Sequence, residues 1–302
     1  MSEDIDEHSA AMQGWDLNYN QISAGPFKGE LFEYGLGWMQ LIRDKTNQSM
    51  VKKGAAPAGS VSFSFPVNFS GNLYCSGNLI PSACVLSALP ENLPELRLPN
   101  FVDVITISIS SSTLERELEL HGVTHEILRQ PKLYQLKDFF VANRLKEILE
   151  LFEKKHGWMG TAIAEKIWRD EIRDLLLWNL LDALPSDQSG ILLPSARKLL
   201  VDRACEYALT HLDEPLSILS LCRKLGASRR KLQYCFQETL GINAVAYLRA
   251  LRLNAVRREL RQGTCTMSVQ DVASRWGFSH MSRFSREYRE MFGELPSKTL
   301  QR

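Results

Sequence analysis

The chain has 302 residues and a formal net charge of +1, with 36 Lys or Arg residues against 35 Asp or Glu residues. Its 44% hydrophobic content allows packed cores and excludes disordered, collagen-like and coiled-coil proteins, and its length predicts about two domains. No segment approaches the roughly 18 consecutive apolar residues of a membrane helix. The acidic segment 1–7 is unlike a signal peptide, so we expect a cytoplasmic protein.

The charge is divided unevenly along the chain. Residues 1–193 carry 17 basic and 25 acidic side chains, whereas residues 194–302 carry 19 and 10, which gives net charges of −8 and +9. A compact basic domain attracts polyanions such as nucleic acid, because neutralised phosphates release counterions; a basic surface kept for solubility is the alternative. We also expect the two oppositely charged halves to attract each other when no polyanion is bound.

The first half is predicted to be rich in strands, because short apolar runs in residues 15–130 alternate with Gly, Pro, Asn and Ser. Three of these runs are predicted strands: 32–42, 60–65 and 102–109. Short strands separated by turn residues are typical of a β-barrel or β-sandwich. Helices are then predicted over 138–155 and 161–184, within a helical part spanning 135–184. Their apolar stripes are explained by a lid over the barrel.

Barrel interiors are frequent small-molecule sites. Aromatic side chains of the predicted barrel are candidates for lining such a site, although aromatic residues on strands also form ordinary core. The six candidates for an effector-binding site are Trp15, Tyr34, Trp38, Phe63, Phe65 and Tyr74. The acidic balance of this half suits a cationic ligand such as a small amine, and it suits solubility equally well.

Neither the cysteines nor the histidines form a recognisable metal or catalytic motif. The six cysteines include no Cys-x-x-Cys pair, and Cys75 and Cys84 are the two that lie close together in a loop-rich stretch. His121 and His125 are four residues apart but lack the Glu of a zinc-binding helix motif, so we expect them at the surface. Phosphate-binding loops and nucleophile elbows are absent as well. We therefore expect no metal site and no enzyme.

A linker is predicted over residues 185–194, because segment 184–190 collects Pro, Ser, Asp and Gly. From Ser195 to residue 302 the apolar spacing is helical throughout. A first helix-turn-helix unit is predicted over 217–237, with Ser217 and Ser228 as N-caps and Gly226 at the turn. The exposed face of its second helix carries groups that read base edges and phosphates: Arg229, Arg230, Lys231, Gln233 and Tyr234.

The same pattern recurs over residues 268–288, with Gly277 at the turn and Ser279 as the N-cap. The outward side chains of its second helix are His280, Met281, Ser282, Arg283, Ser285 and Arg286. A helix over 245–261 carries two apolar stripes where a surface helix needs one. It is therefore predicted to be a central strut that both units contact, holding two recognition helices at a separation that suits successive major grooves, roughly 34 Å apart.

These motifs, together with Trp276-Gly-Phe278 and the segment 292–297, resemble the AraC/XylS family of bacterial transcription regulators over about 100 residues without a gap. The resemblance implies a cupin-like sensor and dimerisation domain over 1–184 and an all-α DNA-binding domain over 195–302, an α+β protein overall. It also implies double-stranded operator DNA, RNA polymerase and a small-molecule effector as partners, with a homodimer as the assembly. The His-x-His and Glu grouping of many such barrels is absent.

The family's base-contacting positions fall on Arg230, Gln233 and Tyr234 in the first unit. In the second unit they fall on a less polar set, Met281, Ser282, Ser285 and Arg286. We therefore expect the first unit to supply more of the sequence discrimination. The second unit is expected to depend on phosphate contacts from Arg283 and Arg286.

Within the family, segments 15–43, 253–260 and 296–302 resemble the regulators of ethanolamine-utilisation operons. This implies an amine effector such as ethanolamine and activation of a catabolic operon; cobalamin as a cofactor follows only from this resemblance. Two alternatives remain open. One is a regulator of virulence or quorum-linked genes with a non-amine or protein signal. The other is an enzyme fused to a helix-turn-helix domain, which requires Cys75 or Cys84 to be a low-pKa thiol.

Overall fold

The computed structural model describes residues 1–81, 83–91, 93–120, 130–136, 139–155, 162–184, 189–212, 217–262 and 267–301. The strands are β1 (Asp16–Gln21), β2 (Gly29–Gly35), β3 (Met39–Thr46), β4 (Met50–Ala55), β5 (Ser60–Phe69), β6 (Tyr74–Cys75), β7 (Asn78–Leu79), β8 (Cys84–Ala88), β9 (Leu96–Leu98), β10 (Val102–Ser110), β11 (Lys132–Gln135) and β12 (Ser189–Ile191). The helices are α1 (Ile5–Ala10), α2 (Ser111–Leu120), α3 (Phe140–Lys155), α4 (Ala162–Asp182), α5 (Ala196–Thr210), α6 (Ile218–Leu225), α7 (Arg229–Leu240), α8 (Ala244–Arg261), α9 (Val269–Arg275), α10 (Met281–Phe292) and α11 (Pro296–Leu300).

The N-terminal half contains two antiparallel sheets packed face to face. Their strand orders are β1-β4-β9-β6-β7 and β12-β11-β8-β5-β10-β3-β2. Side chains from both sheets meet in one buried core, including Tyr19 and Met50 from the first and Ile42, Leu86 and Val104 from the second. We refer to this two-sheet body as the barrel.

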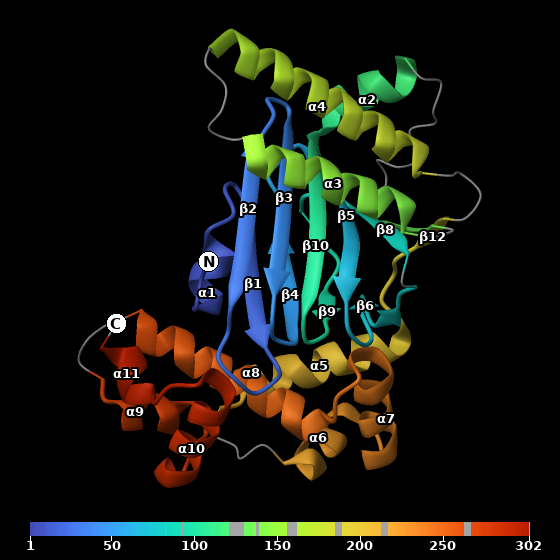
Figure 1. The fold of residues 1–302 in the computed structure, drawn as a ribbon. Helices are drawn as coiled ribbons and strands as arrows, with labels where there is room; N and C mark the ends of the chain where they lie inside the picture. The colour runs from blue at the N-terminus through green and yellow to red at the C-terminus, as the bar shows by residue number, and fades with distance from the viewer. Residues whose placement is uncertain are drawn as a thin grey trace.

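The seven-stranded sheet is covered on its other face by helices. Successive side chains of a strand point to opposite faces, so β10 directs Val104 between the sheets while Ile105 and Ile107 pack with Leu145 of α3 and Leu176 of α4. Helix α3 crosses this sheet, and the C-terminal helices gather at the opposite end of the molecule (Figure 1). The sheet is therefore buried on both faces.

Two of the predicted elements differ from the structure. Segment 32–42 contains two strands, β2 and β3, joined by a tight turn in which the Leu36 N–H donates to the Met39 carbonyl at 2.7 Å. Of the predicted linker, residues 185–188 lie outside the described ranges, and β12 pairs with β11 at the edge of the seven-stranded sheet. The chain therefore leaves the barrel only after this short strand, just before α5.

Every described element after residue 193 is a helix. The predicted caps at Ser217 and Ser228 are confirmed, since each hydroxyl accepts a backbone N–H of the following first turn, and the Ser195 hydroxyl caps α5 in the same way. Gly226 ends α6 in a left-handed conformation with φ of 62°, which costs glycine little. The predicted cap at Ser279 is wrong.

At the second unit the N-cap of α10 is His280, without a side-chain capping bond. The chain continues one residue beyond Ser279 because Phe278 is buried against Phe284, with ring centroids 5.0 Å apart. This aromatic contact fixes where α10 begins.

Candidate DNA-binding surface and effector cavity

The N-terminal end of α7 presents three adjacent cations to solvent. Arg229, Arg230 and Lys231 are exposed, and none of them pairs with a carboxylate among the described residues. Ser228 caps this end through the Lys231 N–H. Cations without partners bind phosphates and base edges without first breaking an internal contact, so this end of α7 is prepared for a polyanion.

Two further predicted positions on α7 have internal contacts. The Ala244 N–H donates to Gln233 Oε1 at 3.4 Å, which links half-buried Gln233 to the start of α8. Tyr234 is 49% exposed, with the Arg197 guanidinium above its ring at 5.4 Å. Tyr234 is therefore accessible, whereas Gln233 must give up a contact to reach a base.

The second recognition helix, α10, is more constrained. Arg283 pairs with Glu287 at 2.8 Å, and Arg286 lies 3.9 Å from Glu290. Met281 packs partly against the core of this unit. Of the other predicted positions, His280 and Ser282 are exposed and Ser285 is half-buried. Arg283 and Arg286 thus have carboxylate neighbours, whereas no described carboxylate pairs with the three cations at the start of α7.

Helix α8 contacts both helix-turn-helix units, as its two apolar stripes predicted. Leu248 and Leu251 belong to the core of the first unit, whereas Leu253, Val256 and Leu260 belong to that of the second. Both recognition helices are thereby held against one rigid helix. The predicted contact of this helix with both units is confirmed, whereas the separation of the two recognition helices stays a prediction.

Buried Arg252 of α8 connects the units through backbone carbonyls. Its guanidinium donates to the carbonyls of Ala208 and His211 at the end of α5 and to that of Trp276 after α9. Carbonyls at helix C-termini carry partial negative charge and lack helical partners. Arg252 therefore satisfies exposed carbonyl ends of two helices at once.

The barrel docks onto α8 through a dense set of ion pairs, and we call this contact region the seam. Arg257 and Arg261 pair with Asp4, and Arg261 also pairs with Glu7 at 2.6 Å. The side chains of Asp4 and Arg257 are only 3% and 5% exposed. Arg258 pairs with Asp6 at 3.2 Å. The acidic residues before and within α1 are therefore bound to the basic outer face of α8.

Burial alone would raise the pKa of the Asp4 carboxyl. The Glu7 N–H, which donates at 3.0 Å, and the Arg257 guanidinium outweigh that effect and hold the pKa below its ordinary value. Asp4 is therefore ionised at neutral pH and pairs as a full charge. Acidic residues of the first half thus pair with basic residues of the second at this contact, which agrees with the expected attraction.

Uncharged groups also join the barrel to α8 and α10. Asn254 donates to the Gln21 carbonyl at 2.8 Å and accepts the Gln21 N–H at 3.0 Å, as a neighbouring strand would. The Gly25 N–H donates to the Glu290 carbonyl at 2.9 Å, near the end of α10. On the other side of the seam, Lys198 of α5 pairs with Glu95 of the barrel at 3.1 Å. The barrel thus contacts α5 and α8 and, through α10, the second unit.

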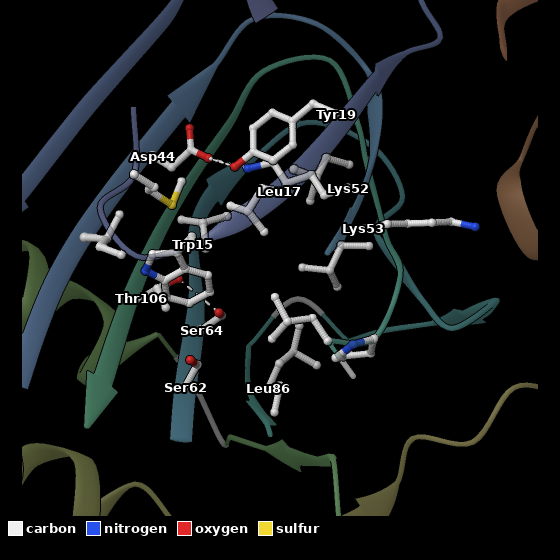
Figure 2. A pocket seen from close by; sticks show the side chains of 18 residues that line it. Trp15, Leu17, Tyr19, Asp44, Lys52, Lys53, Ser62, Ser64, Leu86 and Thr106 are labelled. Carbon is white, nitrogen blue, oxygen red and sulfur yellow. Dashed lines mark hydrogen bonds and ion pairs between the residues drawn. The ribbon is translucent and has the colours of Figure 1, made fainter. Parts of the chain in front are cut away.

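A cavity of about 90 Å³ lies between the two sheets. Its wall is mainly apolar, with hydroxyl groups of Ser62, Ser64 and Thr106 along one side and Trp15 beside them (Figure 2). Ser64 and Thr106 lie 3.0 Å apart, oxygen to oxygen, so part of this hydroxyl row is already hydrogen-bonded. The cavity suits a small molecule with one polar end.

The charged end of the cavity is formed by Asp44, Lys52 and Tyr19 (Figure 2). Asp44 accepts from Tyr19 at 3.2 Å, pairs with Lys52 and lies 2.9 Å from His8 Nε2. Burial alone would raise the pKa of Asp44, but Lys52 and His8 outweigh it and hold the pKa well below its usual value. The carboxylate is therefore charged and already partnered.

The six aromatic candidates are spread over different parts of the barrel. Trp15 lines the cavity. Tyr34, Trp38, Phe63 and Phe65 pack in the core beneath the helices, and Tyr74 lies at the seam beside Gly241. The alternation of Ser62-Phe-Ser-Phe65 places the serines in the cavity and the phenylalanines under the helices. The lining of the cavity is thus more polar than we expected.

The cysteines do not support the fused-enzyme alternative. Burial raises the pKa of both Cys75 and Cys84 to about 12, so each thiol is protonated at neutral pH. His121 and His125 lie outside the described residues. Within the described ranges no group of three or more His, Cys, Asp or Glu residues is arranged to hold a metal. No helix in these ranges has the length and apolarity to cross a membrane.

The family model and the curated relatives described here match the C-terminal third of the chain. Residues 221–302 match the family model described as a helix-turn-helix domain. The probable thc operon regulatory protein of Rhodococcus erythropolis is 36% identical over 102 residues, which are 33% of this chain and 31% of that protein. The XylDLEGF operon transcriptional activator 2 of Pseudomonas putida is 33% identical over 100 residues, 33% of this chain and 64% of that protein.

Among solved structures, a probable AraC family transcriptional regulator from Rhodopseudomonas palustris is 34% identical, with a TM-score of 0.31. That match covers 34% of this chain and 95% of the other. The chain spans less than two thirds of the length of either curated relative. These four matches therefore bear on the DNA-binding part alone.

Fold and comparisons together define a protein with a helix-turn-helix DNA-binding domain. More particularly, the domain is of the AraC-family type, and its homologues are AraC/XylS-type transcription regulators.

Proposed function

We propose that the protein is a ligand-responsive, sequence-specific DNA-binding transcription regulator that activates a catabolic operon from the cytoplasm. The observation that carries the DNA-binding part is the pair of recognition helices mounted on one strut, with Arg229, Arg230 and Lys231 exposed at the end of α7. Activation is proposed because the Pseudomonas relative is named a transcriptional activator. RNA polymerase is the partner that activation requires.

A gel-shift series with Arg230→Ala tests the DNA-reading role. An arginine that contacts a guanine edge contributes about 1 to 3 kcal/mol and defines one base position. We expect the variant to bind the cognate site more weakly by that amount and to tolerate other bases at one position. Arg116→Ala on α2, at the end of the molecule away from α7 (Figure 1), is the matched control. An equal loss of affinity for every sequence would assign Arg230 to phosphate contact instead.

We propose the cavity between the sheets as the effector site, in a domain that we take to be cupin-like. Its volume of about 90 Å³ admits a molecule of a few non-hydrogen atoms, such as ethanolamine. Cobalamin does not fit, because even drug-sized ligands occupy pockets of about 300 Å³ or more. Asp44 is the carboxylate available to an ammonium group, and an amine must displace Lys52 to reach it.

Thermal shift titration with ethanolamine, and with propionate as an anion of similar size, tests the amine assignment. A ligand that binds the folded state alone raises stability by RT ln(1 + [L]/Kd). We expect ethanolamine to raise the Tm of the wild-type protein and to have no effect on Asp44→Asn. Stabilisation by propionate alone would reject the amine effector and favour a non-amine signal. The gel-shift result is independent of both outcomes.

A further inference from the structure

We propose that a groove at the seam, distinct from the cavity between the sheets, binds a small hydrophilic anion bearing a carboxylate or phosphate group, and that Arg97 is its main ligand. The groove has a volume of about 420 Å³. One wall comes from the barrel, including Ser49, Asn72 and Arg97, and the other from the C-terminal end of α7, including Gln237 and Gly241. Figure 1 shows β6 and β9 of the barrel close to α7.

The lining of the groove is polar and carries one charge. Backbone, hydroxyl and amide groups dominate it, and Arg97 is the only charged side chain among the described residues that line it. Such groups donate and accept hydrogen bonds with hydroxylated or phosphorylated molecules. An apolar ligand would leave them without partners, which is unfavourable.

Arg97 differs from the other cations at the seam. Arg257, Arg258, Arg261 and Lys198 each pair with at least one carboxylate, whereas no ion pair joins Arg97 to a carboxylate in the described ranges. Glu95, two residues earlier, is paired with Lys53 at 2.6 Å and with Lys198. The nearest acidic residue along the chain is thus already used by other cations.

The position of the guanidinium is fixed by neutral groups. Arg97 Nη1 donates to the Asn72 carbonyl at 2.8 Å, and the group lies over the ring of Tyr74 at 5.7 Å. Its Nε is buried without an acceptor, and desolvation lowers the pKa of the side chain. A partly desolvated cation without a counter-charge is unfavourable, and an anion beside it relieves that cost.

The anion contacts both domains in this arrangement. The Tyr74 ring packs on Gly241 so closely that a Cβ there would lie 3.2 Å from its hydroxyl oxygen. A molecule bound to Arg97 beside Tyr74 therefore also meets the end of α7, the first recognition helix. Its binding stabilises the docked arrangement of barrel and α7.

Isothermal titration calorimetry of the full chain with inorganic phosphate and with citrate tests the site. We expect millimolar or tighter binding of at least one of them to the wild-type protein, and affinity lower by at least about tenfold, 1.4 kcal/mol, in Arg97→Gln. Arg116→Gln is the matched surface control, and Arg230→Ala removes a cation of the DNA-binding surface. Both controls are expected to bind as the wild type does.

Gln237→Glu provides a second test that leaves Arg97 in place. Gln237 is exposed on α7, so the variant is expected to fold, and its carboxylate repels an anion in the groove. Binding that survives in both Arg97→Gln and Gln237→Glu, or no binding of either anion to the wild type at millimolar concentration, overturns the proposal. Loss in Arg230→Ala but not in Arg97→Gln would place the anion on the DNA-binding surface.

Discussion

Arg252 illustrates how single side chains organise the DNA-binding domain. It is buried, and the bonds described for it go to three backbone carbonyls at the ends of two helices, α5 and α9. Gly277 must lie close to it, because a Cβ at this position would stand 2.4 Å from Arg252 Nη1. Glycine is therefore needed at this turn for two reasons: the closeness of Arg252 leaves no room for a Cβ, and φ is 78°.

Replacing Gly277 by Ala is expected to destabilise the protein more than replacing Gly226 by Ala. Both glycines have positive φ, and for an alanine this backbone conformation costs about 1 to 2 kcal/mol. Gly226 has open space around it, because no atom comes within 4 Å of the place that a Cβ would take, so it isolates the backbone cost. Urea denaturation of both variants measures the difference. Equal losses would show that Arg252 moves aside without cost.

At the scale of elements, the sequence predicted more about the helices than about the sheets. Ser217, Gly226 and Ser228 form a local signal, so α6 and α7 were recognisable from neighbouring residues alone. The strands were recognisable too, but alternation defines two faces without saying which encloses the cavity. The seven-stranded sheet is covered on both faces, and Phe63 and Phe65 pack against α3 and α4, which lie far along the chain. That information is not local.

Exposed apolar side chains on the outer side of α4 lead us to predict a contact between two copies of the chain. Ile167 and Leu175 are 54% and 41% exposed there, on a helix at the opposite end of the molecule from the recognition helices (Figure 1). Their spacing of eight residues places them about 80° apart around the helix axis, within one broad face. We expect the double variant Ile167→Glu, Leu175→Glu to be monomeric and the wild-type protein to be dimeric by light scattering.

Leu199→Glu is the control for this prediction, because Leu199 is a 54% exposed leucine on α5. It is expected to leave the molar mass unchanged. A wild-type protein that is already monomeric would assign α3 and α4 to covering the sheet alone.

For the whole molecule, the near-neutral total charge of +1 is the sum of two halves with net charges of −8 and +9, and the halves contact each other at the seam. Asp4, Asp6 and Glu7 are far in sequence from the arginines they bind. Asp4, for example, precedes Arg257 by 253 residues. The charge imbalance of the halves was visible in the sequence. The particular pairs were not, because nothing local relates the chain's first residues to α8.

This docking is expected to oppose DNA binding at low salt. A fragment beginning at Ser195 presents Arg257, Arg258 and Arg261 without their partners in the barrel, so its positive field is stronger. We predict tighter operator binding by the fragment than by the unliganded full chain, with the difference shrinking as salt screens the charges. Equal or weaker binding by the fragment would indicate that the barrel assists instead, through dimerisation.

The reciprocal bonds between Asn254 and Gln21 bear on how such proteins can be recombined. A chimaera that joins this barrel, at the linker, to the DNA-binding domain of another protein would place the other protein's α8 against the barrel. The residues at the positions of Asn254, Arg257, Arg258 and Arg261 would then be those that contact a different barrel. A chimaera therefore keeps this interface only if the residues at these four positions of α8 are transferred together with the barrel. They must be transferred although they lie within the DNA-binding half.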